Sequence, residues 1–343
     1  MLNAVLVGCG AMSKGWLEAL TGQPSLRDRV AIAGLVDIDL GAAERRRTEF
    51  SLSGAVVGTD LEAVLTKTKP DLVFDVAVPD TRRDVVLSAL RHGCHVLTEK
   101  PMAASMAEAR EIVRAARTAG RVHAVVQNRR FIPGVRRIRR LIATGALGDL
   151  TALHADFFIG AHFGGFREQM QDVLLLDMAI HTLDAARFMA DVDPLAVYCV
   201  ESNPKGSWYA HGAAANAIFE MADGVMFTYR GSWVAEGAIT SWESGWRIIG
   251  TRGTLLWDGH DRFDAHVVSG DTGFLRPLAE LEVLAAPDDA HVHGHTSVIA
   301  DFLDAIAAGR QPETAGEDNI KSLAMVFGAI ESARRGARVP VQI

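Results

Sequence analysis

The first 128 residues alternate short apolar runs with longer segments of helical period, and this rhythm constrains the fold more than any other feature. Runs that are apolar throughout are typical of strands buried on both faces, and helices between such strands imply parallel pairing. The pattern predicts six strands: Ala4–Val7, Ala31–Val36, Ala55–Val57, Leu72–Val78, His95–Leu97 and Val122–Val126. In this order they predict an α/β unit with a doubly wound parallel sheet of the Rossmann type. Its ligand crevice is expected beyond the carboxyl ends of the strands.

The rhythm changes after Asn128. Strand-like alternation from about 150 to 268 surrounds only one clear helix, Asp177–Met189, and the remaining elements flank it. These are helices at Gly134–Thr144, Asp301–Ala308 and Ile320–Ala333 and a last strand at Arg338–Ile343. We therefore expect a dinucleotide-binding domain over 1–125 and an α+β domain over 126–343 built on a large, open, mostly antiparallel sheet.

Charge and composition favour a small-molecule partner. The net charge is −7, and twelve protonated histidines would bring it only to +5, so no global basic surface attracts nucleic acid or an anionic membrane. Arginines between 136 and 140 are expected on a solvated helix face. The three cysteines lie far apart, and we see no leader and no apolar run of membrane-spanning length, so we expect a cytoplasmic protein. The alternating histidines of 291–295 are interpreted as a polar loop, so no metal is expected.

A turn suited to a dinucleotide follows the first strand. Gly8, Gly10, Ala11 and Met12 belong to a tight strand-to-helix connection whose backbone amides can approach a pyrophosphate. Asp37 ends the second strand, where a carboxylate accepts hydrogen bonds from ribose hydroxyls and repels a 2′-phosphate. No arginine stands at 38–40, so NAD is predicted over NADP. A turn that binds nothing, with Asp37 as a cap, is the alternative.

Two further motifs carry groups suited to proton and charge transfer. Lys100 stands between Glu99 and Pro101 at the end of the fifth strand, where its ammonium could stabilise charge on a substrate oxygen. Asp177 and His181 are four residues apart, one turn of a helix, and imidazole can exchange a proton with a hydroxyl. Asp184 is expected to orient that ring. A surface lysine and a buried, self-satisfied histidine are the alternatives.

These motifs together resemble the family of glucose-fructose oxidoreductases, inositol dehydrogenases and rhizopine-catabolism proteins along nearly the whole chain. The resemblance rests on the glycine turn, Asp37, Glu99–Pro101, Asp177–Asp184 and the tail from Asp301 to Val341, and also on Pro79 and 128–131. It implies a two-domain NAD(P)-dependent sugar or polyol oxidoreductase with its active site between the domains and a second-domain sheet used for oligomerisation. It also implies that Lys100, Asp177 and His181 are catalytic, and that Pro79, Glu99, Lys100 and Asn128 lie beside the cofactor.

We therefore predict hydride transfer between nicotinamide and a secondary or anomeric hydroxyl of a sugar, cyclitol or sugar derivative, in a homodimer or homotetramer. His181 takes the hydroxyl proton, Lys100 stabilises the alkoxide, and Asp177 orients the substrate. Arg129 and Arg167 are expected to bind an anionic substrate group or to form ion pairs between the domains, and Trp242 to offer an indole face to the sugar. A glycosidase that oxidises, eliminates and re-reduces with NAD retained is one alternative. A non-catalytic nucleotide-sensing regulator is another.

Overall fold

The computed structural model describes residues 1–285 and 294–343 and divides into two compact units. Within the described residues, the first unit holds 1–128 and 294–320, and the second holds 129–285 and 321–343. The first division therefore falls three residues after the expected one. The assignment of 294–320 to the first unit departs from the expected division at 126. Its physical reason is packing, because α9 (His295–Ala308) contacts α1 (Ser13–Gly22) and α2 (Pro24–Arg27).

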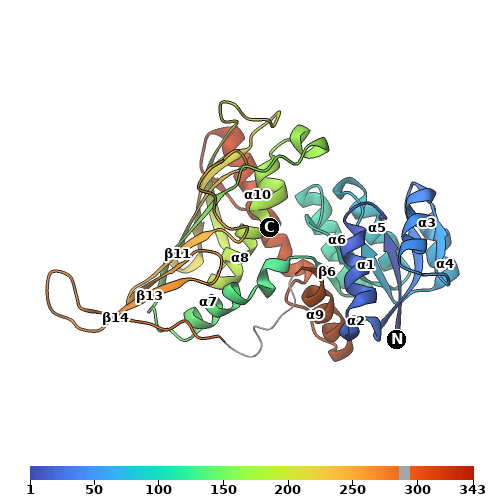
Figure 1. Cartoon of the computed structure of the whole chain (residues 1–343), viewed down its shortest axis with the longest axis horizontal. Coiled ribbons are helices and arrows are strands. Elements are labelled where there is room, and N and C mark those ends of the chain that lie inside the picture. The colour runs from blue at the N-terminus through green and yellow to red at the C-terminus, as the bar shows by residue number, and fades with distance from the viewer. Residues whose placement is uncertain (286–293) are drawn as a thin grey trace. The chain divides into compact units, whose positions relative to one another are not determined.

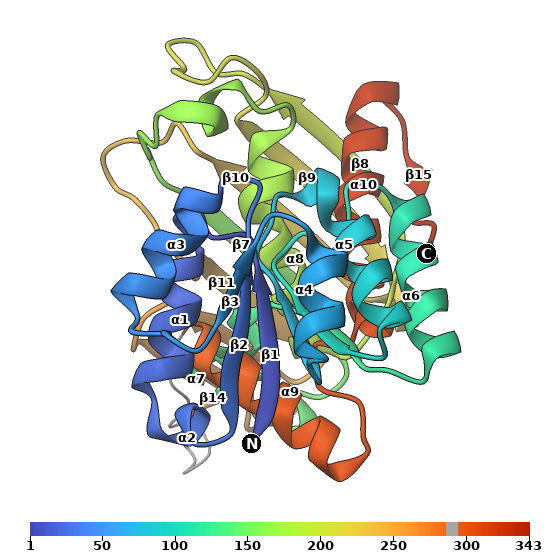
Figure 2. The same ribbon diagram turned by 90° about the vertical axis from the view of Figure 1, so that its right-hand side faces the viewer.

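The first unit is built on the predicted parallel sheet. Its six strands lie in the order β3-β2-β1-β4-β5-β6 and all neighbours are parallel. They span Leu2–Val7 (β1), Val30–Val36 (β2), Val56–Gly58 (β3), Leu72–Asp75 (β4), His95–Thr98 (β5) and His123–Val125 (β6). The other helices are Leu40–Glu49 (α3), Leu61–Thr68 (α4), Pro79–Arg91 (α5) and Met106–Ala119 (α6). Figure 2 shows α1 and α5 on opposite sides of the sheet, which is therefore covered on both faces.

Local sequence explains where several of these elements end. Ser105 caps α6 by accepting the amide of Glu108, and Gly120 ends that helix in the left-handed conformation at φ 61°. Strand β4 stops at Asp75, three residues before the predicted end at Val78. The Asp75 side chain accepts the Ala77 amide at 3.0 Å, and this short-range bond turns the chain out of the sheet.

The second unit contains a nine-stranded sheet in the order β14-β13-β12-β11-β7-β10-β9-β8-β15. Among the described strands of this sheet, only β7 and β10 pair in parallel, as expected for a mostly antiparallel sheet. The strands span Leu150–Phe158 (β7), Pro194–Ser202 (β8), Ala214–Met221 (β9), Met226–Ser232 (β10), Gly245–Gly250 (β11), Gly253–Trp257 (β12), Phe263–Val268 (β13), Leu278–Glu280 (β14) and Val339–Pro340 (β15).

Helices cover one face of this sheet (Figure 1). They are α7 (Pro133–Ala143), α8 (Ile180–Ala190) and most of α10 (Gly316–Arg335), and a π-helical turn, η3 (Leu174–Ala179), precedes α8. The described residues also form the 3₁₀ turns η1 (Asn128–Phe131), η2 (Gly165–Gln169) and η4 (Ala222–Gly224). Along β8 and β9 buried residues alternate with residues of the other face, where Tyr198, Val200 and Ile218 are exposed. The second unit thus has one packed sheet face and one open face.

The arginines of α7 do not form the solvated face that was expected. Arg139 lies over the ring of Phe188 at 4.1 Å and Arg137 over that of Phe263 at 4.4 Å. Each guanidinium also donates to a backbone carbonyl, that of Phe188 and that of Val283 respectively. Long arginine stems bury readily against rings while their charged ends keep polar contacts, so this helix packs through its basic residues. Among the described residues, no helix combines the length and apolarity needed to cross a membrane.

Candidate functional site

The glycine turn after β1 has a different steric requirement at each of its two glycines. Gly8 adopts φ +90°, and a Cβ there would lie 2.6 Å from both the Ala77 nitrogen and the Val76 carbonyl carbon. Gly10 has no heavy atom within 4 Å of an added Cβ, so the space above it is open. Ala11 and Met12 follow, and α1 begins at Ser13. The turn therefore offers an uncovered backbone at a helix N-terminus, the arrangement that accepts a phosphate group.

Asp37 is held beside this turn by two backbone amides. Its Oδ2 accepts from Cys9 at 2.6 Å and its Oδ1 accepts from Asp39 at 2.8 Å. A carboxylate oxygen has lone pairs for more than one donor, so both oxygens keep capacity for ribose hydroxyls. An arginine that stands later in the sequence than residues 38–40 also contacts the turn. Arg46 donates to the Gly10 carbonyl and the Ser13 hydroxyl, both at 2.9 Å, and pairs with Glu49.

Buried polar atoms at the end of β6 fit a bound polar group at this edge of the sheet. Gln127 is fully buried, and neither its Nε2 nor its Oε1 has a hydrogen-bond partner among the described residues. The Oδ1 of Asn128 is likewise buried and has no hydrogen-bond partner among those residues. Burying such atoms without partners is costly. Pro79 begins α5 just after β4, at the same edge. The open space above Gly10, the carboxylate of Asp37 and these amide groups therefore fit a bound dinucleotide.

Lys100 follows β5 in a turn that is anchored on both sides. Glu99 is buried, and its Oε1 accepts from Trp16 Nε1 at 2.7 Å and lies 2.8 Å from His295 Nε2. Burial acts to raise the pKa of Glu99, but the hydrogen bonds and charges of His295, Trp16 and Lys100 outweigh it, and the pKa is lowered. Glu99 is thus an anion at neutral pH beside the predicted catalytic lysine.

The other anchor, Arg82, was not predicted from the sequence. Arg82 is 1% exposed, donates to the Pro101 carbonyl and binds Asp75 Oδ2 at 3.1 Å. Burial raises the pKa of Asp75, and Arg82 opposes that shift. An aspartate at the end of an otherwise apolar strand was the available signal, because a buried carboxylate requires a partner. Arg82 therefore acts as a positioning residue for the Lys100 turn.

In the second unit, Asp177 and His181 lie where η3 passes into α8. Asp177 Oδ2 accepts from Arg167 Nε at 2.9 Å, and the guanidinium of Arg167 lies 5.1 Å from the rings of both Phe163 and Phe166. Arg167 thus forms an ion pair inside its own unit, whereas the ion pair expected of it was one between the domains. Sequence spacing did not reveal the π-helical turn.

The prediction that Asp184 orients His181 is not supported by the contacts of Asp184. This carboxylate is fully buried and binds Arg130 through two hydrogen bonds of 2.6 and 2.7 Å, while Oδ1 also accepts from Ser322 at 2.6 Å. Paired charges of opposite sign satisfy a buried carboxylate, so its lone pairs are directed to the arginine. Asp184 is a structural anchor of α8.

His181 lines a small cavity together with Arg129, Trp242 and Glu243. Its volume is about 10 Å³, room for roughly one water molecule. Arg129 pairs with Glu243, and burial lowers the pKa of Arg129 to about 10. Trp242 is 47% exposed and keeps an indole face accessible. The neighbouring Trp233 and Trp246 are buried, as core residues of the sheet are.

The structure therefore gathers the predicted residues into two groups. The cofactor group and Lys100 lie in the first unit, and the remaining substrate and catalytic residues lie in the second, including Arg129, Arg167, Asp177, His181 and Trp242. Within the described residues no cluster of histidine, cysteine or carboxylate side chains is arranged to hold a metal ion. His291 and His293 of the alternating motif lie outside the described residues, whereas His295 binds Glu99.

Comparisons with known proteins agree with this geometry. Residues 2–127 match the model of an oxidoreductase family with an NAD-binding Rossmann fold, and residues 135–256 match a GFO/IDH/MocA C-terminal domain. A 1,5-anhydro-D-fructose reductase of Ensifer adhaerens is 29% identical over 347 residues, covering 98% of each chain. A D-apiose dehydrogenase of Paraburkholderia graminis is 27% identical over 349 residues, covering 99% of this chain and 90% of that protein.

Solved structures share the fold. An oxidoreductase from Agrobacterium radiobacter, in complex with NAD⁺, L-tartaric acid and magnesium, superposes with a TM-score of 0.84 at 20% identity, covering 99% of this chain and 98% of that one. At this identity the likeness concerns architecture. The two domain models, the glycine turn and the anchored Asp37 together show that the chain belongs to the NAD-binding GFO/IDH/MocA family of oxidoreductases.

Proposed function

We propose that this protein is an NAD-dependent dehydrogenase that oxidises a secondary or anomeric hydroxyl of a sugar, cyclitol or sugar derivative. Family membership and the sugar-converting relatives support this substrate class. The observation that carries the proposal is the Asp37 carboxylate, fixed by the Cys9 and Asp39 amides beside an uncovered Gly10. Such a carboxylate accepts ribose hydroxyls and repels a 2′-phosphate, so NAD is favoured over NADP.

NAD, when bound, supplies the acceptor for the hydride. His181 takes the proton of the substrate hydroxyl, a transfer for which a neutral imidazole is suited. Lys100 stabilises negative charge on the same oxygen, since an ammonium held in place costs little reorganisation during the reaction. Asp177, paired with Arg167, orients the substrate. Trp242 offers its exposed face to the sugar ring, and Arg129 and Arg167 bind anionic groups where the substrate carries them.

The open face of the nine-stranded sheet supports a homo-oligomer, which we propose to be a dimer or a tetramer. Tyr198, Val200 and Ile218 are 43%, 49% and 47% exposed on neighbouring strands of this face. A contiguous apolar patch of this kind is typical of an interface between protein chains. We also place the protein in the cytoplasm, a placement that fits its three buried, free cysteines.

A panel of sugars, sugar acids and inositols, assayed with NAD and with NADP, tests the proposed function. Absorbance of the reduced cofactor should rise with one product formed per NADH, and NAD should act at lower concentration than NADP. Release of an aglycone from glycosides without net NADH would instead establish the retained-NAD glycosidase. Tight NAD binding without turnover of any substrate would favour the regulator, and equal use of NADP would refute the role of Asp37.

A further inference from the structure

A cavity of the first unit lies at the sheet edge opposite to the nucleotide-binding residues. Its volume is about 380 Å³, and the residues that line it include His95 and His123, which begin β5 and β6. The cofactor residues Asp37 and Lys100 follow the carboxyl ends of their strands instead. The cavity is therefore separate from the dinucleotide crevice and takes no part in the reaction described above.

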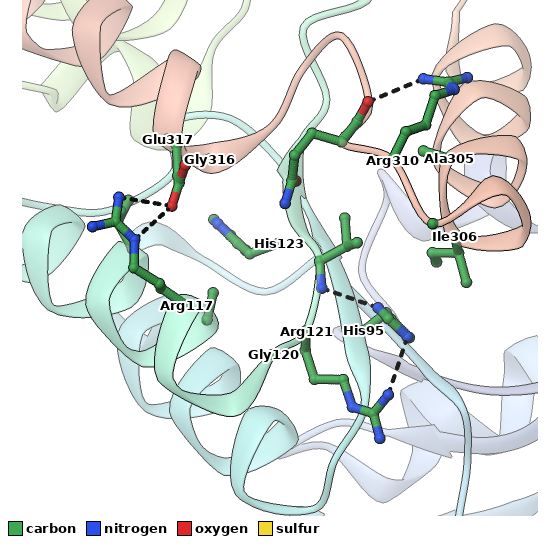
Figure 3. Close-up of a pocket in the computed structure, with 15 residues that line it drawn as sticks. His95, Arg117, Gly120, Arg121, His123, Ala305, Ile306, Arg310, Gly316 and Glu317 are labelled. Carbon is green, nitrogen blue, oxygen red and sulfur yellow. Dashed lines mark hydrogen bonds and ion pairs between the residues drawn. The ribbon is translucent and has the colours of Figure 1, made fainter.

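Positive charge dominates the lining of this cavity. Arg117, Arg121 and Arg310 contribute three cations, and Glu317 is the one carboxylate among the described residues that line it. Figure 3 shows the guanidinium of Arg117 beside Glu317 and that of Arg121 beside His95, whereas that of Arg310 points away from His123. The formal charges of the three arginines and Glu317 sum to +2, in a chain whose net charge is −7. A concave surface lined by one sign of charge concentrates the opposite ion, so a dianion matches this lining.

The three guanidinium groups differ in how firmly they are engaged. Arg310 is bound to Asp301 at 2.7 Å and donates to the Gln311 carbonyl. Arg117 pairs with Glu317 at 3.0 Å, with both side chains well exposed to solvent. An exposed pair contributes at most modestly to stability, so a ligand can replace the carboxylate.

Arg121 has no carboxylate partner among the described residues. Within the described part of the chain, its guanidinium lies 3.5 Å from the Nε2 of His95. His95 Nδ1 accepts the Val122 amide at 3.0 Å, which leaves the proton of a neutral ring on Nε2, facing the guanidinium. Burial and the charge of Arg121 lower the pKa of His95, so the ring is neutral. The N–H groups of Arg121 therefore retain their capacity to bind an anion.

His123 provides a second, independent indication of a ligand. The side chain is 4% exposed, and its Nδ1 has no hydrogen-bond partner among the described residues. Burial lowers the pKa of His123 to about 3, so the ring offers a neutral polar atom and no charge. Gly316, the first residue of α10, also lines the cavity and leaves the Nδ1 side of the ring without a Cβ, which would stand 2.3 Å away.

The partial charges of the helix ends at the cavity do not cancel its preference for an anion. Helices α6 and α9 end here at Gly120 and Gly309, and carbonyl ends repel anions. Two carbonyls in the last turn of each helix, however, accept the amides of the two glycines and of Arg121 and Arg310. The N-terminus of the twenty-residue helix α10, by contrast, carries the favourable partial charge.

We propose that this cavity binds a small dianionic metabolite, a phosphate ester or a dicarboxylate, at a site independent of NAD. Guanidinium groups bind both kinds of ligand through paired N–H groups, so the shared chemistry is a compact double negative charge. Arg121 is the principal contact, Arg117 and Arg310 complete the charge, and Glu317 is the group that the ligand displaces.

Calorimetric titration of the full chain with inorganic phosphate, glycerol phosphate and succinate tests this proposal. We expect saturable binding at one site per chain, with an unchanged dissociation constant when NAD is saturating. The stronger of the phosphate and succinate arms identifies the ligand class. Binding that NAD abolishes would place the anion in the pyrophosphate crevice and overturn the proposal, as would the absence of saturable binding in all three arms.

Two variants with opposite expected effects locate the site. Arg121→Gln should weaken binding about 5- to 10-fold, since it removes a charged donor. Glu317→Gln should strengthen binding, because it removes the competing carboxylate. Arg27→Gln is the matched control and should change nothing, because Arg27 is an exposed arginine of the same unit whose ion-pair partner among the described residues is its neighbour Asp28. Equal binding by all three variants and the wild type would refute the assignment.

Discussion

Substituting alanine at the two glycines of the β1 turn should separate folding from cofactor binding. At Gly8 a Cβ meets the backbone of Val76 and Ala77 at 2.6 Å, and the backbone has φ +90°. Val76 and Ala77 follow β4, and their amides are bound to the Val7 carbonyl and the Asp75 side chain, so this backbone cannot move aside as a flexible side chain does. At Gly10 the added Cβ meets nothing within 4 Å. Gly8→Ala should therefore destabilise the first unit, and Gly10→Ala should affect only what binds above the turn.

The size of each effect follows from these contacts. Left-handed backbone costs a residue with a Cβ about 1–2 kcal/mol, and an overpacked site costs about 1–3 kcal/mol more. Gly8→Ala should thus lose about 2–5 kcal/mol, a drop in Tm of roughly 5–15 °C for a unit of this size. Gly10→Ala should stay within about 0.5 kcal/mol of the wild type in stability. A methyl group at the pyrophosphate should nevertheless weaken NAD binding roughly 5- to 150-fold, the equivalent of about 1–3 kcal/mol.

Thermal unfolding and calorimetric NAD titration of both variants measure these effects. Gly54→Ala is the matched control, because its added Cβ also meets nothing within 4 Å and it lies away from the turn. It should leave both Tm and NAD affinity unchanged. Wild-type NAD affinity in Gly10→Ala would refute the placement of the pyrophosphate above this turn. A wild-type Tm in Gly8→Ala would show that the close approach to Val76 and Ala77 is not required.

Three further predictions concern catalysis and assembly. Lys100→Ala should lower kcat by about 10²-fold or more with little change in NAD affinity, because charge on the reacting oxygen develops in the transition state. Steady-state kinetics measure this effect, and a wild-type kcat in the variant would remove Lys100 from the mechanism. The oxidation rate should rise with pH as His181 becomes neutral, and His181→Asn should oxidise slowly and lose this acid limb; an unchanged pH–rate profile would contradict a role as base. Light scattering should give a mass above the 36.9 kDa of one chain for the wild type. It should give a smaller assembly for Ile218→Asp, because Ile218 is 47% exposed on the open sheet face. A wild-type protein that is monomeric at micromolar concentration would refute the interface.

Local sequence was sufficient to predict the strands of the first unit and the sheet edge at which the glycine turn and Asp37 lie. Apolar runs alternating with helical periods predicted six strands of the first unit, and all six are present. Ser105 and Gly120 predicted the two ends of α6, because capping residues act on backbone groups only a few positions away. The glycine turn and Asp37 were also found, because parallel strands place their carboxyl ends at one edge and Asp37 lies at that edge.

Other features depended on contacts between residues distant in the chain. Glu99 binds His295 across 196 positions, and Asp184 binds Ser322 across 138, so neither partner could be read from spacing. The return of 294–320 to the first unit follows from the packing of α9 on α1 and α2. Periodicity and capping reflect forces within a few residues, whereas the partner of a buried charge is selected by whichever side chain the packed chain brings within hydrogen-bond reach. The elements were therefore decided by the sequence locally, and the Arg82–Asp75 anchor of Lys100, the Arg130–Asp184 pair and the cationic cavity around His123 were decided only by the tertiary structure.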